Sequence, residues 1–431
     1  MAEPAPLAAL PGPIAYLTGE YPRATDTFIQ REVAALRALG ITVHTCSVRR
    51  TDAAHHVGAE QKAEAAATFY VIRAARRPLT LLAAHAAALT RAPGRYLRAL
   101  GLALTNGAPG LKGLAWQLFY FAEAGVLARH LRGLGVCHLH NHFGNSSCTV
   151  AMLTSALSGI PYSYTMHGPA IFFAPERWRI DVKIARAAFV SCISHFSRSQ
   201  GMIFAAPEHW AKMHIVHCGV DPAVYDRPAV PASEGCGPRL LFVGRLAAVK
   251  GLPMLLDAAA ALAAEHPGLR LTIVGDGPDR AWLEARAAEL GIGAQVVFTG
   301  YRSQAEVADA LTETDVFVLP SFAEGVPVVL MEAMAARVPV VATRVAGVAE
   351  LVEDGVSGHL VPPGDAETLT GALRRIMGDE ALRRAMGAAG RARVLEAFDA
   401  RREASRLAGL FAAHHAGAPR PALRPPETEP G

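Results

Sequence analysis

The sequence has few charged residues for its length, and lysine is especially scarce. Charged residues make up 19% of the 431 positions, and the only lysines are Lys62, Lys112, Lys183, Lys212 and Lys250. The net charge of +4 is too small for the strongly basic domain or stripe that nucleic-acid-binding proteins show. No nucleic-acid partner is therefore expected, and a lysine inside a motif stands out against this composition.

Paired cysteines are also absent. The six cysteines, among them Cys46 and Cys236, follow no regular spacing and form no Cys-x-x-Cys pair. This argues against a disulfide framework and against a structural zinc site, and it favours a reducing, cytosolic compartment. The segment Met1–Pro13 has no basic stretch ahead of an apolar core, so no secretory signal is predicted.

Long hydrophobic runs are missing, although 51% of the residues are hydrophobic. Pro78–Thr90, Ala99–Leu111 and Gly113–Ala122 are each interrupted by His, Asn, Gly, Pro or charge. None reaches the ~18–20 apolar residues of a membrane-spanning helix. Composition and length instead predict a globular chain of at least two domains.

One long stretch lacks acidic residues altogether. None occurs between Glu64 and Glu123, whereas that stretch carries seven basic residues: Arg73, Arg76, Arg77, Arg91, Arg95, Arg98 and Lys112. Subtracting these seven from +4 leaves −3 for the remainder, so the basic excess lies in an apolar helical insertion at about residues 65–122. One interpretation is a solvated helix face. The hypothesis preferred here is peripheral attachment to an anionic membrane, each surface cation contributing about 1 kcal/mol.

Strand and helix patterns alternate along both halves of the chain. The N-terminal half shows a helical pattern at Thr27–Leu39 and predicts strands at Pro13–Thr18, Ile41–Val48, Val136–His140, Pro161–Met166, Phe189–Ile193 and Met213–Val216. The C-terminal half predicts strands at Leu240–Gly244, Leu271–Gly275, Val296–Gly300, Val316–Pro320 and Pro339–Thr343. Continuous apolar strands of this kind are typical of parallel sheets covered on both faces.

These patterns predict an α/β chain with two doubly wound, Rossmann-like domains. We expect an N-terminal domain at residues 1–220, a linker at 221–238 and a C-terminal domain at 239–398. A helix at 399–415 is expected to pack back on the first domain, ahead of a disordered tail at 416–431. Ligands of such sheets bind at the carboxyl ends of the strands, so a site in the cleft between the domains is expected.

An acidic motif follows the predicted strand Val316–Pro320. Gly325 allows backbone to approach a ligand closely, and Pro327 fits the first turn of a helix whose free N–H groups favour an anion. Glu324 stands at that anion site, and Glu332 lies about two turns further on. Both could be solvated helix-end charges, but two carboxylates around a phosphate site suit a sugar nucleotide.

A basic motif follows the first strand of the same domain. Gly244-Arg245 comes directly after the strand, and Lys250-Gly251 stands at the next predicted helix start. Arg245 and Lys250 together could neutralise a diphosphate through charge-assisted hydrogen bonds.

With Pro339–Thr343, these motifs closely resemble the C-terminal domain of retaining glycosyltransferases of family 4, which have the two-domain GT-B fold. The N-terminal half resembles the bacterial exopolysaccharide and colanic-acid type members in Tyr16–Pro22, Thr27–Glu32, His140–Gly144 and Thr165–Gly168. The resemblance implies retaining sugar transfer from a nucleotide diphosphate sugar to a saccharide acceptor, for example a lipid-linked one, with no cofactor and no metal. The lack of an Asp-x-Asp pair agrees with that implication.

The resemblance also implies that the domain at residues 1–220 binds the acceptor and that the domain at 239–398 binds the nucleotide sugar, and it implies roles for individual residues. Arg245 and Lys250 would bind the donor phosphates and stabilise the departing diphosphate, Glu324 would contact the donor sugar, and Glu332 the ribose. The predicted donor-binding set is Arg245, Lys250, Gly300, Tyr301, Glu324, Gly325, Val326, Pro327 and Glu332, with Gly300-Tyr301 near the base. The predicted catalytic set is Glu324, His167, Arg245 and Lys250, with His167 beside the donor sugar.

The acceptor side is assigned to Gly19, Glu20, His140 and His142. Many family members have a Gly-Gly pair where this chain has Gly19 alone. His138, His140 and His142 alternate along a predicted strand and so share one face. No acidic or thiolate partner is evident on that face in the sequence, so no metal site is predicted there.

Two other functions fit parts of the pattern. A dinucleotide-dependent oxidoreductase is suggested by Gly275 and Gly277 after a strand, but Arg280 stands where the fingerprint needs a third glycine. A non-catalytic nucleotide-sugar-binding protein on the same fold is the other alternative. The four charged residues at 245, 250, 324 and 332 favour the enzyme.

Overall fold

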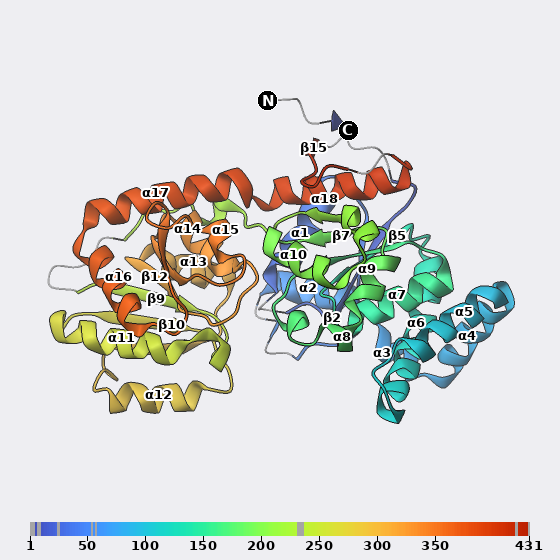
Figure 1. Ribbon diagram of the computed structural model, residues 1–431, viewed down its shortest axis with the longest axis horizontal. Coiled ribbons are helices and arrows are strands. Elements are labelled where there is room, and N and C mark those ends of the chain that lie inside the picture. The colour runs from blue at the N-terminus through green and yellow to red at the C-terminus, as the bar shows by residue number, and fades with distance from the viewer. Residues whose placement is uncertain are drawn as a thin grey trace. The chain divides into compact units, whose positions relative to one another are not determined.

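Two parallel β-sheets organise the chain (Figure 1). The computed structural model describes residues 5–6, 10–23, 26–52, 55–56, 58–230, 237–418 and 421–429. Unit 1 comprises residues 1–217 and 401–431, and unit 2 comprises residues 218–400. Cys236 and most of the first nine residues, on which the prediction about a secretory signal rested, lie outside the described residues.

The sheet of unit 1 has seven strands in the order β4-β3-β2-β5-β6-β7-β8, all parallel. They are β2 (Ile14–Glu20), β3 (Val43–Arg49), β4 (Phe69–Tyr70), β5 (His138–His142), β6 (Tyr162–Met166), β7 (Val190–Cys192) and β8 (Met213–Ile215). The chain moves outward from β2 to β4 and then returns to place β5 on the other side of β2. The topological switch point of this sheet therefore lies between β2 and β5.

Helices cover both faces of this sheet. They include α1 (Thr27–Ala38), α2 (Ala59–Ala67), α7 (Ser146–Ser158), α8 (Pro175–Trp178), α9 (Ile180–Arg186) and α10 (His195–Phe204). Asn145 caps α7 by accepting from the Ser147 N–H at 3.1 Å, and Gly159 ends it at φ +79°. One apolar core contains residues of α7 and of α6 (Leu111–Gly133), and a second core contains residues of α1 and of α18 (Ala400–His415).

Four helices follow β4 and form the predicted insertion: α3 (Val71–Ala75), α4 (Pro78–Arg91), α5 (Pro93–Thr105) and α6 (Leu111–Gly133). α4 buries Ala84 and Ala88, and α5 buries Ala99 and Ala103, so small residues make the inner contacts. Nine large apolar side chains of the insertion remain exposed: Leu79, Leu82, Leu89, Leu97, Leu104, Leu111, Trp116, Leu118 and Phe119. Within the described residues, no helix has both the length and the apolar character that crossing a membrane would require.

The sheet of unit 2 has six parallel strands in the order β11-β10-β9-β12-β13-β14. They are β9 (Arg239–Val243), β10 (Arg270–Val274), β11 (Val296–Gly300), β12 (Val316–Leu319), β13 (Val340–Thr343) and β14 (Gly358–Val361). The helices are α11 (Leu252–Glu265), α12 (Arg280–Glu289), α13 (Gln304–Thr312), α14 (Val328–Ala335), α15 (Val348–Leu351), α16 (Ala366–Gly378) and α17 (Glu380–Ala397). The switch point of this sheet lies between β9 and β12.

The segment predicted as a linker is part of unit 2 where it is described. Pro222 and Tyr225 are buried, and the Val230 N–H donates to the Thr312 carbonyl at 2.8 Å. Residues 231–236 lie outside the described residues.

The described part of the C-terminal segment makes specific contacts, which differs from the predicted disordered tail. α18 (Ala400–His415) contributes Leu407 and Phe411 to the core of unit 1. Beyond it, the Ile215 N–H of β8 donates to the Leu423 carbonyl at 2.7 Å. Composition alone did not reveal these contacts, because they depend on the position of β8 and α18.

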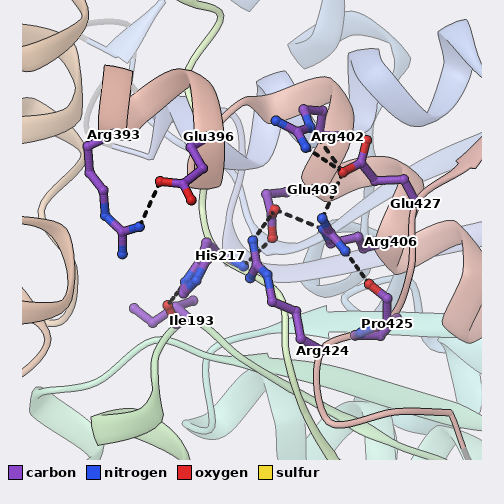
Figure 2. Close-up of polar contacts among 10 residues, drawn as sticks. All are labelled: Ile193, His217, Arg393, Glu396, Arg402, Glu403, Arg406, Arg424, Pro425 and Glu427. Atoms are coloured by element: carbon purple, nitrogen blue, oxygen red, sulfur yellow. Dashed lines mark hydrogen bonds and ion pairs between the residues drawn. The ribbon is translucent and has the colours of Figure 1, made fainter. Parts of the chain in front are cut away.

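Figure 2 shows the polar cluster that holds this segment. Glu403, 3% exposed, accepts from the His217 N–H at 2.8 Å, from Arg406 at 3.2 Å and from Arg424 at 2.8 Å. Glu427 pairs with Arg402 at 2.8 Å and with Arg406 at 2.7 Å. Burial raises the pKa of Glu403, and the neighbouring arginines oppose that rise.

Candidate functional site

A basic and an acidic side chain meet at the switch point of unit 2. Lys250 Nζ donates to Glu324 Oε1 at 2.6 Å, and these side chains are 20% and 10% exposed. Lys250 lies in the loop after β9, and Glu324 lies in the loop after β12. The structure thus brings together the two charged residues that the sequence placed in separate motifs 74 positions apart.

Backbone contacts fix these two loops against each other. The Phe322 N–H donates to the Val249 carbonyl at 2.8 Å. Gly251 has φ +64°, and a Cβ at that position would lie 2.1 Å from the Pro320 carbonyl oxygen. Only glycine satisfies both conditions, so the Lys250–Glu324 contact rests on a rigid support.

Gly275 and Gly277, which suggested a dinucleotide fingerprint, have a structural role in this chain. A Cβ at Gly275 would lie 1.9 Å from the Gly244 carbonyl oxygen, and one at Gly277 would lie 2.2 Å from that of Leu246. The Leu246 N–H also donates to the Asp276 carbonyl at 3.0 Å. These glycines let the loop after β10 approach the loop after β9, which explains them without a dinucleotide.

The other predicted phosphate and base residues lie on the same edge. Arg245 is exposed and forms no ion pair within the described part of the chain. Gly300 ends β11 at φ +75°, and its carbonyl accepts from the Gly275 N–H at 2.9 Å. Tyr301 follows, 41% exposed. Arg245 and Tyr301 therefore remain accessible to a ligand.

The residues after Glu324 lead into α14. Pro327 precedes Val328, the first helical residue, so it stands one position earlier than the sequence suggested. The first N–H groups of α14 have no acceptor inside the helix, as at every helix start. Val326 and Glu332 are both buried, and the Gly325 carbonyl accepts from the Gly347 N–H at 3.1 Å.

In unit 1, the predicted acceptor residues lie on the two strands at its switch point. Gly19 and Glu20 end β2; a Cβ at Gly19 would meet open space, and Glu20 forms an ion pair of 3.7 Å with Arg23. His140 and His142 lie on the neighbouring strand β5. Both histidines are fully buried, which differs from their predicted role in lining a ligand surface.

The buried histidines form a hydrogen-bonded network instead. His140 contacts the Ser163 hydroxyl at 2.8 Å and the Thr165 hydroxyl at 2.9 Å, while His142 Nδ1 lies 2.9 Å from His167 Nε2. His138 Nε2 shares the Ser163 hydroxyl at 2.8 Å. Burial lowers the pKa of His140 and of His167 well below the usual value, so both are neutral at neutral pH.

Glu32 of α1 belongs to this network, and it corrects the reason given for excluding a metal. Its Oε1 accepts from the Tyr16 hydroxyl at 2.6 Å and lies 3.2 Å from His142 Nε2. Glu32, His140 and His142 offer three ligand atoms within 4.8 Å of one another. An acidic partner for the histidines is therefore present, although it comes from a helix rather than from the same strand.

Glu123 is a second acidic group that the sequence did not single out. It lies on α6, and burial raises its pKa to about 7, against the opposing effect of Arg49 at the end of β3. A carboxyl group that titrates near neutral pH is a candidate for proton transfer. The sequence signal was weak, because Glu123 only ended the acid-free stretch.

Two doubly wound parallel sheets, with paired charges at the carboxyl edge of the second, agree with the GT-B fold. Residues 228–393 match the family described as Glycosyl transferases group 1. The chain is 30% identical over 292 residues to the 2-deoxystreptamine glucosyltransferase of Streptomyces kanamyceticus, covering 61% of this chain and 72% of that protein. The chain belongs to the glycosyl transferases group 1 family.

Two further comparisons extend over most of the chain. It is 27% identical over 387 residues to a colanic acid biosynthesis glycosyltransferase of Salmonella typhimurium, covering 84% of this chain and 89% of that protein. The structure of Anabaena HepE in complex with UDP superposes with a TM-score of 0.65 at 18% identity, covering 90% of this chain and 96% of that one. The latter similarity concerns the fold.

Proposed function

We propose that this glycosyltransferase moves a sugar from a nucleoside diphosphate sugar to a saccharide acceptor, with retention of the anomeric configuration, as family 4 enzymes do. The Lys250–Glu324 pair at the switch point of unit 2 carries the proposal. The exposed Arg245 adds a second cation on the same edge. The UDP complex of the HepE fold relative and the relationship to colanic acid biosynthesis support a nucleotide sugar and an exopolysaccharide product.

In this proposal a donor separates Lys250 from Glu324. The diphosphate takes the Lys250 ammonium and the Arg245 guanidinium, and a hydroxyl of the donor sugar takes the Glu324 carboxylate. Each member of the ion pair exchanges one partner for another, so neither charge is left unpaired. Tyr301 and Gly300 would hold the base, Glu332 the ribose, and His167 would act as a neutral hydrogen-bonding group toward the sugar.

The test is turnover with a panel of nucleotide sugars, measured as nucleoside diphosphate release. Lys250→Ala and Glu324→Ala should each lower kcat by about 100-fold or more, the usual effect of removing a group that stabilises transition-state charge. Arg374→Ala is the matched control, because Arg374 pairs with Glu265 on the surface of the same unit. Wild-type turnover in Lys250→Ala or Glu324→Ala would remove the assignment.

We propose that the reaction needs no metal, because Arg245 and Lys250 supply the positive charge on the diphosphate. EDTA should then leave turnover unchanged. A loss of about tenfold or more, restored by a divalent ion, would contradict this, and the Glu32, His140 and His142 cluster would be the first place to look for the ion.

For the acceptor, we propose a lipid-linked saccharide reached by peripheral attachment to the cytoplasmic face of a membrane. The exposed leucines of α4 recur as Leu79, Leu82 and Leu89, which places them on one helix face. Trp116 and Phe119 form a similar stripe on α6, with Lys112 one turn before. Apolar stripes beside cations are typical of helices that lie in the membrane interface.

Vesicle flotation tests this attachment. Binding should require anionic lipid, weaken with salt, and fall in a Leu79→Ser, Leu82→Ser variant. A Val297→Ser variant, changed at an exposed apolar residue of unit 2, is the control. Binding that neither needs anionic lipid nor responds to salt would count against the proposal.

A further inference from the structure

A cavity of about 520 Å³ opens at the amino edge of the unit 1 sheet. Its wall includes Gly135 and Val136, just before β5, and Ile160, just before β6. The residues proposed for catalysis and acceptor binding in unit 1 lie at or near the carboxyl ends of these strands, so the cavity is a separate place on this unit. Three arginines line it: Arg91 at the end of α4, Arg95 on α5 and Arg132 on α6.

Two of these arginines are held in position by the end of α7. Arg132 donates to the Leu157 carbonyl at 2.8 Å and to the Ser158 carbonyl at 3.0 Å, and Arg95 donates to the Ser158 carbonyl at 3.2 Å. A Cβ at Gly159 would collide with the Arg95 guanidinium, so that glycine leaves room for it. Carbonyls at a helix C-terminus attract cations, and this explains why Arg95 and Arg132 lie at the end of α7. These hydrogen bonds use only some of the five N–H donors of each guanidinium.

The cavity gathers positive charge without a compensating acid. None of its lining residues is acidic, and none of the three arginines forms an ion pair within the described ranges. Burial lowers the pKa of Arg132, and Arg91 and Arg95 lower it further by repulsion. Three like charges close enough to repel one another favour an anion as the missing partner.

We propose that Arg91, Arg95 and Arg132 form a binding pocket for a phosphate-containing anion. Guanidinium groups suit this ligand because their planar forks bind phosphate oxygens in pairs. The phosphate could belong to a soluble ion or to a lipid headgroup, and exposed Leu89 and Leu97 beside the arginines make the second source compatible with the pocket.

The first arm of the test titrates inorganic pyrophosphate by calorimetry. The titrations use an Arg245→Ala, Lys250→Ala chain, so that both cations of the proposed donor site are absent. An added Arg91→Gln, Arg95→Gln pair should weaken binding at least about tenfold, since two charge-assisted contacts are lost. Arg91→Gln alone, at a side chain with no hydrogen bond in the described structure, gives a variant whose folding should not suffer. Arg98→Gln is the matched control, because Arg98 also lies on α5 but outside the cavity.

The second arm measures flotation of the same variants with phosphatidylcholine vesicles, with and without phosphatidylglycerol. Pyrophosphate binding that the pocket variants lose and the Arg98→Gln control keeps assigns the pocket to a soluble phosphate. A pocket-specific loss of binding to anionic vesicles, without pyrophosphate binding, assigns it to a headgroup. Equal behaviour of pocket variants and control in both arms overturns the proposal. Neither arm measures sugar transfer, so its result is independent of the proposed activity.

Discussion

Tyr16 is buried in unit 1, and its hydroxyl depends on Glu32. Glu32→Ala would leave that hydroxyl without its carboxylate acceptor and should lower the free energy of unfolding by about 1–3 kcal/mol. Glu32→Gln should cost less, because the amide oxygen can still accept from Tyr16. Chemical denaturation of the two variants against the wild type measures the difference.

The same two variants distinguish a structural role of Glu32 from a role of its negative charge in catalysis. If the histidine network needs the negative charge of Glu32 beside His142, Glu32→Gln will lose transfer activity while it keeps most of its stability. Equal stability of the alanine and glutamine variants would show that the Tyr16 hydrogen bond contributes nothing measurable.

Glu123 makes stability depend on pH near neutrality. Its pKa of about 7 in the folded chain lies above the ordinary value of 4.5, so the folded state binds the proton more tightly than the unfolded state. The tighter proton binding stabilises the folded state by up to about 3 kcal/mol. This stabilisation is fully present below pH 4.5 and is lost as the pH rises through 7. Glu123→Gln should therefore gain Tm relative to the wild type between about pH 5 and pH 8.

Thermal melts across that pH range check the prediction. Glu176→Gln on α8 provides the control, because Glu176 is exposed to solvent, and this variant should follow the wild-type curve. Parallel curves for wild type and Glu123→Gln would mean that Glu123 does not titrate in this range.

At the scale of elements, apolar periodicity located most strands of both sheets. β4 and β14 were missed, because Phe69–Tyr70 has only two residues and Gly358–Val361 begins with glycine and histidine and so shows no continuous apolar run. These two edge strands exist because a neighbouring strand is already in place to pair with them. Their register is a property of the sheet and is absent from local sequence.

The unit 2 site could be predicted for a related reason. Its residues follow strands directly, so knowing where β9 and β12 end also locates Lys250 and Glu324. Glu32 and Glu123 lie on helices, and their partners His142 and Arg49 are distant in sequence. Only the packing of α1 and α6 on the sheet brings such groups together.

Gly251, in the loop after β9, allows a test of whether backbone packing holds the Lys250–Glu324 contact in place. Gly251→Ala would force a residue at positive φ against the Pro320 carbonyl, and should cost about 1–3 kcal/mol and displace the Lys250–Glu324 contact. Turnover should fall with it. Gly371→Ala in α16 is the control, because its Cβ meets open space and alanine favours a helix.

The control should be neutral or up to about 1 kcal/mol more stable than the wild type. Gly251→Ala with wild-type stability and turnover would show that the loop can shift without affecting the ion pair. Denaturation and nucleoside diphosphate release distinguish these outcomes.

At the scale of the whole molecule, unit 1 is built from both ends of the chain. Arg424→Ala removes one of two arginines from buried Glu403 and should destabilise unit 1 by about 1–3 kcal/mol. A chain ending at residue 418 should lose more, because the Leu423 carbonyl no longer accepts from β8. Arg384→Ala, at an exposed pair with Glu380, should stay within about 0.5 kcal/mol.

Calorimetry of the three variants measures these changes. A chain ending at residue 418 that melts like the full chain would contradict the structural role of the C-terminal segment. The Glu403 cluster would then be sufficiently paired by Arg406 and the His217 N–H alone.

The resting Lys250–Glu324 pair also bears on what happens after each proposed turnover. A departing nucleoside diphosphate keeps Lys250 occupied but no longer offers Glu324 a sugar hydroxyl. The buried Glu324 carboxylate then competes with the product for Lys250. Re-formation of the ion pair would expel the product, so inhibition by the spent nucleotide should be weak and the enzyme should keep working as that nucleotide accumulates.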